Sequence, residues 1–204
     1  MGELHVNMNI TLDGVIQANG GTTAQDAGYP YGGWERPYGD EESGAQVAAD
    51  AEAADALLLG HTTYEIFRTY WPDQTSRIGT AFNSIPKYVA SRGTPELTWQ
   101  DSTQVTDAAT EVRDLRERHE QIHTWGSADL LRTLFDAGLV DRVNLRMHPV
   151  VLGMGKRLFA EGTVPTRFEL AEPPRAYSGG SVLLRYRRLE GPPVTDGPQP
   201  TNGE

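Results

Sequence analysis

Short apolar stretches alternate with helix-forming ones along most of the chain, and this alternation limits the possible folds more than any other sequence feature. Near the start, Leu4, Val6, Met8 and Ile10 occupy every second position, the spacing of a strand with one buried face. Further strands are predicted at residues 56–60, 85–91, 96–100, 121–125 and 140–153. Helices are predicted between strands at residues 41–56, 62–70, 106–119 and 127–138.

Strands separated by helices pair in parallel, because a parallel pair needs a long crossover connection. The end of the chain follows another pattern, since residues 167–189 are typical of two strands that turn at Ser178-Gly179-Gly180. We therefore predict an α/β fold with a mostly parallel central sheet, an antiparallel C-terminal edge and helices on both faces.

Small polar residues mark where the predicted helices begin, because their side chains can accept hydrogen bonds from unpaired N–H groups. Asp40 or Ser43 is expected to cap the first helix, and Thr62 or Thr63 the second. Ser127 is expected to cap the helix that follows the strand at 121–125.

The chain is predicted to form a single domain over residues 1–189. Residues 19–44 are an insertion rich in glycine and aromatic side chains, and a loop of this length in a compact domain is usually functional or disordered. Its three tyrosines and Trp34 favour function, so we interpret it as an active-site loop. Residues 190–204 are rich in proline and glycine and are expected to be a disordered tail.

Composition excludes several classes of protein. The chain has no cysteine, which rules out disulfides, thiolate metal sites and cysteine nucleophiles. Its formal net charge of -10 disfavours nucleic acid as a partner, because the surface repels phosphates. There is neither a secretory signal nor a run of about 18 apolar residues, so a cytoplasmic protein that does not enter membranes is expected.

The stretch "HEQIH" at 119–123 has the H-E-x-x-H spacing of zinc metalloproteases. That motif binds metal only when a helix places both imidazoles on one face. Here the predicted helix ends near His119, and His123 belongs to the next strand. We therefore expect no metal at these histidines, and a zinc hydrolase is the least favoured hypothesis.

Four stretches taken together resemble the dihydrofolate reductase-like family. They are "NITLDGVI" at 9–16, "ALLLGHTTYEIF" at 56–67, "IPKYVAS" at 85–91 and the long stretch at 125–159 that begins with "WGSADLL". Their order resembles most closely the branch named after the reductase domain of bacterial riboflavin biosynthesis, in its stand-alone form. The resemblance covers about residues 3–189 and implies a dihydrofolate reductase-like fold that binds NADPH at the carboxyl ends of its strands.

The resemblance assigns the cofactor phosphates to two strand-to-helix turns, where N–H groups and the helix dipole favour anions. It places the adenine ribose beside Ser91 and Arg92, and the nicotinamide beside Ile16 and the backbone around Ala18. The residues of the two turns are Gly60, His61, Thr62 and Thr63 in the first, and Trp125, Gly126, Ser127, Ala128, Asp129 and Leu130 in the second.

The sequence departs from the family pattern at both turns. Relatives often carry an arginine that pairs with the 2′-phosphate where this chain has His61, so NADH stays possible beside NADPH, although Arg92 can supply the missing charge. Dihydrofolate reductases proper join a Gly-Gly pair by a cis peptide at the second turn. Because Gly126-Ser127 stands there, the resemblance does not carry a cis bond over to this chain.

Hydride transfer also needs a proton source or a group that polarises the acceptor. The family resemblance places a carboxylate in the zone of Asp40, Glu41 and Glu42 at the start of the first helix, where spacing does not single out one of the three, although Glu42 is included among the site residues. Asp13, where the first strand ends, is the other candidate. Each can instead be structural, as a turn residue or as part of a solvated helix start. Trp34 and Tyr38, with Tyr31, are expected to form an aromatic lid, although they can equally pin a long loop to the surface.

These features predict an NADPH-dependent reductase of a small planar or conjugated substrate, such as a pterin-like or flavin-precursor-like heterocycle, an imine or an enone. The resemblance implies a homodimer. The alternative is a non-catalytic NADP(H)-binding or sensing protein of the same fold, since a fold does not set chemistry.

Overall fold

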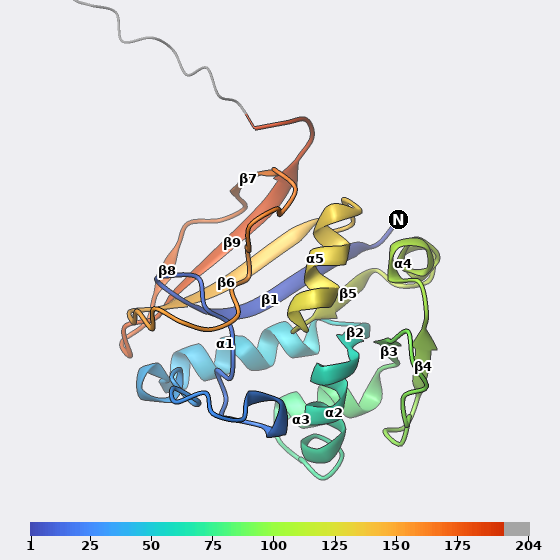
Figure 1. Ribbon diagram of the computed structural model, residues 1–204, viewed down its shortest axis with the longest axis horizontal. Helices are drawn as coiled ribbons and strands as arrows, with labels where there is room; N and C mark the ends of the chain where they lie inside the picture. The colour runs from blue at the N-terminus through green and yellow to red at the C-terminus, as the bar shows by residue number, and fades with distance from the viewer. Residues whose placement is uncertain (194–204) are drawn as a thin grey trace, which may run out of the picture.

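The computed structural model describes residues 1–193, and its core is one mixed sheet (Figure 1). The strands follow the order β4-β3-β2-β5-β1-β6-β9-β7, and β8 also pairs with β9. All pairings from β4 to β6 are parallel, whereas β9 runs antiparallel to β6, β7 and β8. The predicted fold class is therefore confirmed, including its antiparallel C-terminal edge.

The elements lie close to the predicted positions. The strands are β1 Glu3–Thr11, β2 Ala56–Gly60, β3 Lys87–Ala90, β4 Ser102–Val105, β5 Gln121–Thr124, β6 Arg142–His148, β7 Arg167–Leu170, β8 Arg175–Ala176 and β9 Val182–Leu189. The helices are α1 Glu41–Glu52, α2 His61–Tyr70, α3 Arg77–Ser84, α4 Ala108–Arg118 and α5 Ala128–Asp136, with short 3₁₀ turns at Ala24–Asp26 and Arg36–Tyr38.

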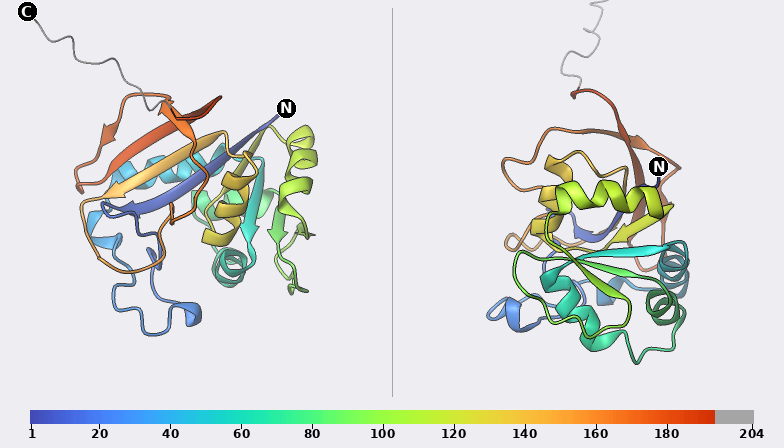
Figure 2. Two further views of the ribbon diagram at one scale, coloured as in Figure 1. Left: turned by 45° about the horizontal axis from the view of Figure 1, so that its top comes forward. Right: turned by 90° about the vertical axis from the view of Figure 1, so that its right-hand side faces the viewer.

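Helices cover both faces of the sheet (Figure 2). On one face, α4 and α5 pack over the apolar side of β1, where Leu4 and Val6 are fully buried. On the other face, α1, α2 and α3 enclose a second core that contains Tyr64 and Phe82. Two separate cores explain why β2 is buried along its whole length, with alternate leucines facing opposite sides.

The strand register also places polar residues in the middle of the sheet. Asn7 lies opposite Asn144, and Asn9 lies opposite Arg146. The Asn144 amide donates to the Asn7 side-chain oxygen at 2.9 Å, and the Asn7 amide nitrogen lies 3.3 Å from His123 Nδ1, so Asn7 is paired on both sides. Polar residues on the interior of a sheet are costly unless they are paired or face a ligand.

Four details differ from the prediction. Strand β4, Ser102–Val105, was not predicted. Residues 96–100 form no strand, because Trp99 turns into the second core, where its N–H donates to the Tyr64 hydroxyl at 3.1 Å. Helix α3 was not predicted, since it is short and carries a glycine in its middle. The C-terminal region forms three strands rather than two, because β7 and β8 both pair with β9.

Helix α4 ends before His119, which has extended backbone angles, and His123 lies in β5. The prediction that these histidines share no helical face is confirmed. The His119 and Tyr88 side chains are hydrogen-bonded at 2.9 Å, and the His123 ring stacks on His5 at 4.6 Å between centroids. Of residues 1–193, no three His, Asp or Glu side chains are placed to hold a metal ion together.

No helix within the described part of the chain is both long and apolar enough to cross a membrane. Residues 194–204, most of the predicted tail, lie outside the described residues.

Candidate active site

The two strand-to-helix turns lie against each other. The Gly60 N–H donates to the Gly126 carbonyl at 3.1 Å. A side chain at Gly60 would place its Cβ 2.0 Å from the Ser127 Oγ and 2.8 Å from its backbone nitrogen, so only glycine allows this approach. Gly126 has a positive φ of 122°, and the Gly126-Ser127 peptide is cis. The cis bond that the resemblance left open is therefore present.

The helices that begin at these turns have no side-chain caps. Asp40, Ser76 and Asp107 cap α1, α3 and α4 through their side chains, whereas α2 and α5 begin at Gly60 and Ser127 without such a hydrogen bond. The expectation for Asp40 is confirmed. The expected cap at Thr62 or Thr63 is wrong, because both threonines lie inside α2. Ser127 occupies the N-cap position of α5 as predicted, but its hydroxyl makes no cap bond.

The first N–H groups of a helix have no partner within the helix and need an acceptor. In α2 and α5 no side chain supplies one. The two positive helix ends thus lie beside each other with free donors, the arrangement that binds phosphate groups.

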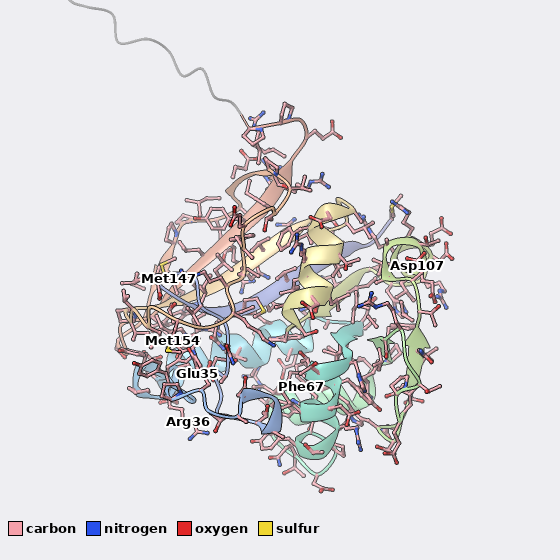
Figure 3. The ribbon with its side chains drawn as sticks, in the orientation of Figure 1. Glu35, Arg36, Phe67, Asp107, Met147 and Met154 are labelled. Carbon is pink, nitrogen blue, oxygen red and sulfur yellow. The ribbon has the colours of Figure 1, made fainter. Side chains whose placement is uncertain are left out.

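A cavity of about 930 Å³ opens at these turns. It runs from α2 and the second turn across the polar middle of the sheet to the insertion at 19–44. Glu35 of the insertion and Phe67 of α2 both line it. Figure 3 labels these two side chains. The residues predicted for the site that line it are Ile16, Tyr38, Thr62, Thr63, Trp125, Gly126, Ser127 and Ala128.

The other predicted cofactor residues do not line the cavity. His61 is half exposed and lies 3.5 Å from the Glu65 carboxylate, and Leu130 is buried in the first core. Gly60 lies behind the lining, and Asp129 lies in the first turn of α5. Ser91 and Arg92 follow the end of β3.

The insertion forms one wall of the cavity. Trp34 is buried, and its indole N–H donates to the Gln17 carbonyl at 2.8 Å. The rings of Trp34 and His148 pack edge to face with 5.3 Å between their centroids, so Trp34 anchors the insertion to β6. Tyr38 lines the cavity, whereas Tyr31 is exposed. Of the expected aromatic lid, only Tyr38 is therefore placed to contact a ligand, and the pinning interpretation fits Trp34.

Ala18 has a left-handed backbone with φ of 53°, which is uncommon for a residue with a side chain. Its carbonyl accepts from the Gly33 N–H at 2.8 Å and from the Gly21 N–H at 3.1 Å. These bonds hold the start of the insertion against Gly33 in its middle, so residues 18–33 form a closed loop.

The carboxylate of Asp13 is occupied by structural partners. It accepts hydrogen bonds from the Thr11 hydroxyl at 2.6 Å and from the N–H groups of Gly153 and Leu152 at 2.9 and 3.2 Å. These bonds, first that from Thr11, lower the pKa of Asp13 to about 2. A carboxyl that is so firmly ionised is a poor proton donor, and we leave Asp13 out of the proposed chemistry.

We expect Asp13→Asn to loosen the loop around Gly153. Because the pKa of Asp13 is depressed, its contribution to stability is present above pH 4 and is lost as the pH falls towards 2. The variant should melt about 2–4 °C lower at pH 7, the shift that a loss of about 1 kcal/mol gives in a domain of this size. Thermal denaturation at pH 7 and pH 3 checks this, and an equal difference at both values would contradict it.

The acidic residues at the start of α1 are engaged by structural partners, although Asp40 also lines the cavity. Glu42 is exposed and forms an ion pair with Arg175 of β8. Asp40 caps α1 and also accepts from the Gly179 N–H at 2.7 Å, which ties α1 to the hairpin turn. Hydrogen bonds, first that from Ser43, hold the pKa of Asp40 far below its usual range. The geometry thus favours the structural interpretation for both residues.

Sequence reasoning missed Glu35. This half-buried carboxyl lines the cavity and accepts from the Asn19 amide at 2.8 Å. Burial raises the pKa of Glu35, which favours its protonated form. Its position beside Trp34 in the aromatic insertion was the available signal, but its burial depends on the folded loop.

Sequence reasoning also missed the polar face of β6. The alternation that predicted buried Val143 and Leu145 places Asn144, Arg146 and His148 on the opposite side. All three line the cavity. Burial, and next the charge of Arg146, lower the pKa of His148 to about 4, so this ring is neutral near pH 7.

The layered sheet and the paired turns define a protein of the dihydrofolate reductase-like fold class. The RibD C-terminal domain family model matches residues 3–179. The chain therefore belongs to that family.

The chain is also similar to individual known proteins in sequence or in structure. The chain is 30% identical over 138 residues to the uncharacterized protein YyaP of Bacillus subtilis (strain 168), which covers 65% of this chain and 73% of that protein. A protein from Shewanella sp. PV-4, proposed to act in riboflavin biosynthesis, has a TM-score of 0.69 at 16% identity and covers 92% of this chain and 99% of its own. Dihydrofolate reductase from Enterococcus faecalis, solved with NADP(H), has a TM-score of 0.58 at 14% identity over 93% and 98% of the two chains.

Proposed function

We propose that this protein is an NADPH-dependent reductase of a small planar or conjugated substrate. The observation that carries the proposal is the pair of uncapped helix ends, α2 and α5, which meet at Gly60 and Gly126 and open into one cavity. The cavity is large enough for a nicotinamide beside a small ring system. Membership of the RibD C-terminal domain family supports a reductase, and the NADP(H) held by the dihydrofolate reductase neighbour supports the cofactor.

Different residues of the chain have different roles along the cavity. When bound, the reduced nicotinamide supplies a hydride. The N–H groups at the starts of α2 and α5 hold the phosphates, and Ile16 and Tyr38 contact flat groups in the middle. Glu35, in its protonated form, supplies the proton that must accompany the hydride.

Titration with NADPH and NADH tests the proposal directly. Trp71 and Trp125 line the cavity, so binding should change the intrinsic tryptophan fluorescence. Oxidation of the bound cofactor is then followed at the nicotinamide absorbance with pterins, flavin precursors, imines and enones. If neither cofactor binds, the proposal fails. If NADPH binds but none of these substrates is reduced, the non-catalytic sensor is the better description.

Preference for NADPH is expected to depend on Arg92. His61 lies 3.5 Å from the Glu65 carboxylate, which is already in an ion pair with Arg68 at 2.7 Å, so the charged side chains on this side of the turn are paired with each other. A 2′-phosphate therefore needs a cation from the other side, which Arg92 at the end of β3 can supply.

We expect Arg92→Gln to weaken NADPH binding about tenfold and to leave NADH binding within about twofold, since a hydrogen bond to a charged group contributes about 1.5–3 kcal/mol. Fluorescence titration of both cofactors measures this. Equal losses for NADPH and NADH would mean that Arg92 has no role in selecting the 2′-phosphate. The homodimer remains a prediction from the family resemblance.

A further inference from the structure

We propose that Arg146 binds a carboxylate of the substrate, so that the protein reduces a planar molecule that carries an acid group. This inference rests on the proposed function for its reductive step, but it concerns a separate end of the cavity. Arg146 is half-buried on β6 and lines the cavity opposite Asn9 of β1.

The guanidinium of Arg146 has no partner. Within residues 1–193 it makes no hydrogen bond or ion pair, and its Nε is buried with no acceptor. In contrast, two neighbouring arginines of the same sheet form ion pairs. Arg142 pairs with Glu3 at 2.8 Å, and Arg185 pairs with Asp50 at 2.5 Å and with Glu172 at 2.8 Å. A buried arginine without an acceptor is costly, and the cost is removed when an anion binds.

The nearby acids are already engaged. Asp50 takes the ion pair with Arg185, and Glu35 accepts from Asn19. Both are close enough to act on Arg146 electrostatically, but neither forms an ion pair with it. Arg146 therefore keeps a positive charge that no acidic side chain in the described part of the chain pairs with, so its guanidinium is available to bind a ligand.

The surroundings favour a flat carboxylate. Arg146 offers a planar fork, which matches the two oxygens of a carboxylate. Tyr38 and His148 line the same cavity, and the depressed pKa of His148 keeps its ring neutral. The other cations of the lining are more exposed, and Arg36 already donates to the Gly20 carbonyl at 2.6 Å. Lys156 is exposed.

The position of Arg146 separates it from the expected phosphate site. Strand β1 lies between β6 and β5, the strand that leads into the second turn. Neighbouring strands are about 4.8 Å apart, so β6 and β5 are about 10 Å apart. Arg146 can therefore hold a substrate while the turns hold the cofactor.

A matched pair of ligands tests the inference without a known substrate. Quinoxaline-2-carboxylate and quinoxaline-2-carboxamide have the same ring and similar size, but only the first is an anion. We expect calorimetric titration of the wild-type protein to show about ten- to hundredfold tighter binding of the carboxylate, the factor that charge-assisted hydrogen bonds provide. Equal affinities would overturn the proposal, and so would displacement of the carboxylate by inorganic phosphate at similar concentration.

The variant Arg146→Gln should bring the ratio of the two affinities to about one. Arg187→Gln is the matched control, because Arg187 lies exposed on β9 in an ion pair with Glu169 at 2.5 Å and should leave the ratio unchanged. Arg146→Lys should retain part of the preference, since it keeps the charge but loses the planar fork. A ratio that survives in Arg146→Gln would overturn the role of this residue.

The wild-type ratio remains decisive if Arg146→Gln does not fold. The titrations are run with and without NADPH. If the wild-type protein does not bind NADPH, the proposed function is contradicted. The carboxylate preference is read separately, from the titration without cofactor. The two failures are therefore distinguishable.

Discussion

Glu35→Gln is expected to lower the turnover number about 100-fold at pH 7 and to leave NADPH affinity within about twofold. Glutamine keeps the size and can still accept the hydrogen bond from Asn19, but it cannot release a proton. General acid catalysis typically contributes about 10²–10⁴ to a rate. Stopped-flow measurement of a single turnover isolates this step from product release.

The pH dependence gives an independent check. Only the protonated carboxyl can donate, and the protonated form predominates below the pKa. Since burial raises the pKa of Glu35, turnover of the wild-type protein should stay high at mildly acidic pH and decline as the pH rises through that pKa. The decline should vanish in Glu35→Gln.

Glu42→Gln is the control for this prediction. Glu42 belongs to the acidic zone at 40–42 where the family resemblance placed a carboxylate, and it is exposed and paired with Arg175 instead. We expect its variant to retain turnover within about twofold. A large loss in Glu42→Gln together with normal turnover in Glu35→Gln would reverse our assignment of the acid.

Gly60→Ala is expected to disrupt the contact between the two turns. The added methyl would lie 2.0 Å from the Ser127 Oγ, which can rotate away, but also 2.8 Å from the Ser127 nitrogen, which cannot. Overpacking of this kind costs about 1–3 kcal/mol. Because both helix N-termini take part in the proposed phosphate site, NADPH affinity should fall about tenfold or more.

Chemical denaturation and NADPH titration measure the two effects of Gly60→Ala. Gly44→Ala serves as the stability control, since a methyl there meets no atom within 4 Å and Gly44 lies in α1. Alanine is favoured over glycine in a helix by about 1 kcal/mol, so that variant should gain stability. If Gly60→Ala is as stable as the wild-type protein and binds NADPH normally, the two turns do not depend on close contact.

The sequence predicted the parts of the fold that local patterns encode. The alternation of Leu4, Val6, Met8 and Ile10 located β1, and Asp40 marked the start of α1. It failed where packing overrides local preference. Trp99 lies in a stretch typical of a strand, but its burial against Tyr64 keeps it out of the sheet.

Only the part of the candidate site formed by the two strand-to-helix turns was predictable from the sequence. Glycines and small polar residues at strand ends indicated the two turns, because phosphate binding by backbone N–H groups leaves a local mark in the sequence. The acid and the arginine left no such mark. Glu35 is one of several acidic residues in the insertion, and Arg146 is one of several arginines on β6 and β9.

The sequence by itself therefore determined most of the element order, the parallel sheet and the positions of the two strand-to-helix turns. Only the tertiary structure decided that Asp13 and Glu42 are held by structural partners, that Glu35 is buried at the cavity, and that Arg146 has no partner. The physical reason is that a pattern of side chains fixes local conformation, whereas the pKa and the hydrogen-bond partners of a charged group depend on neighbours that are distant in the chain.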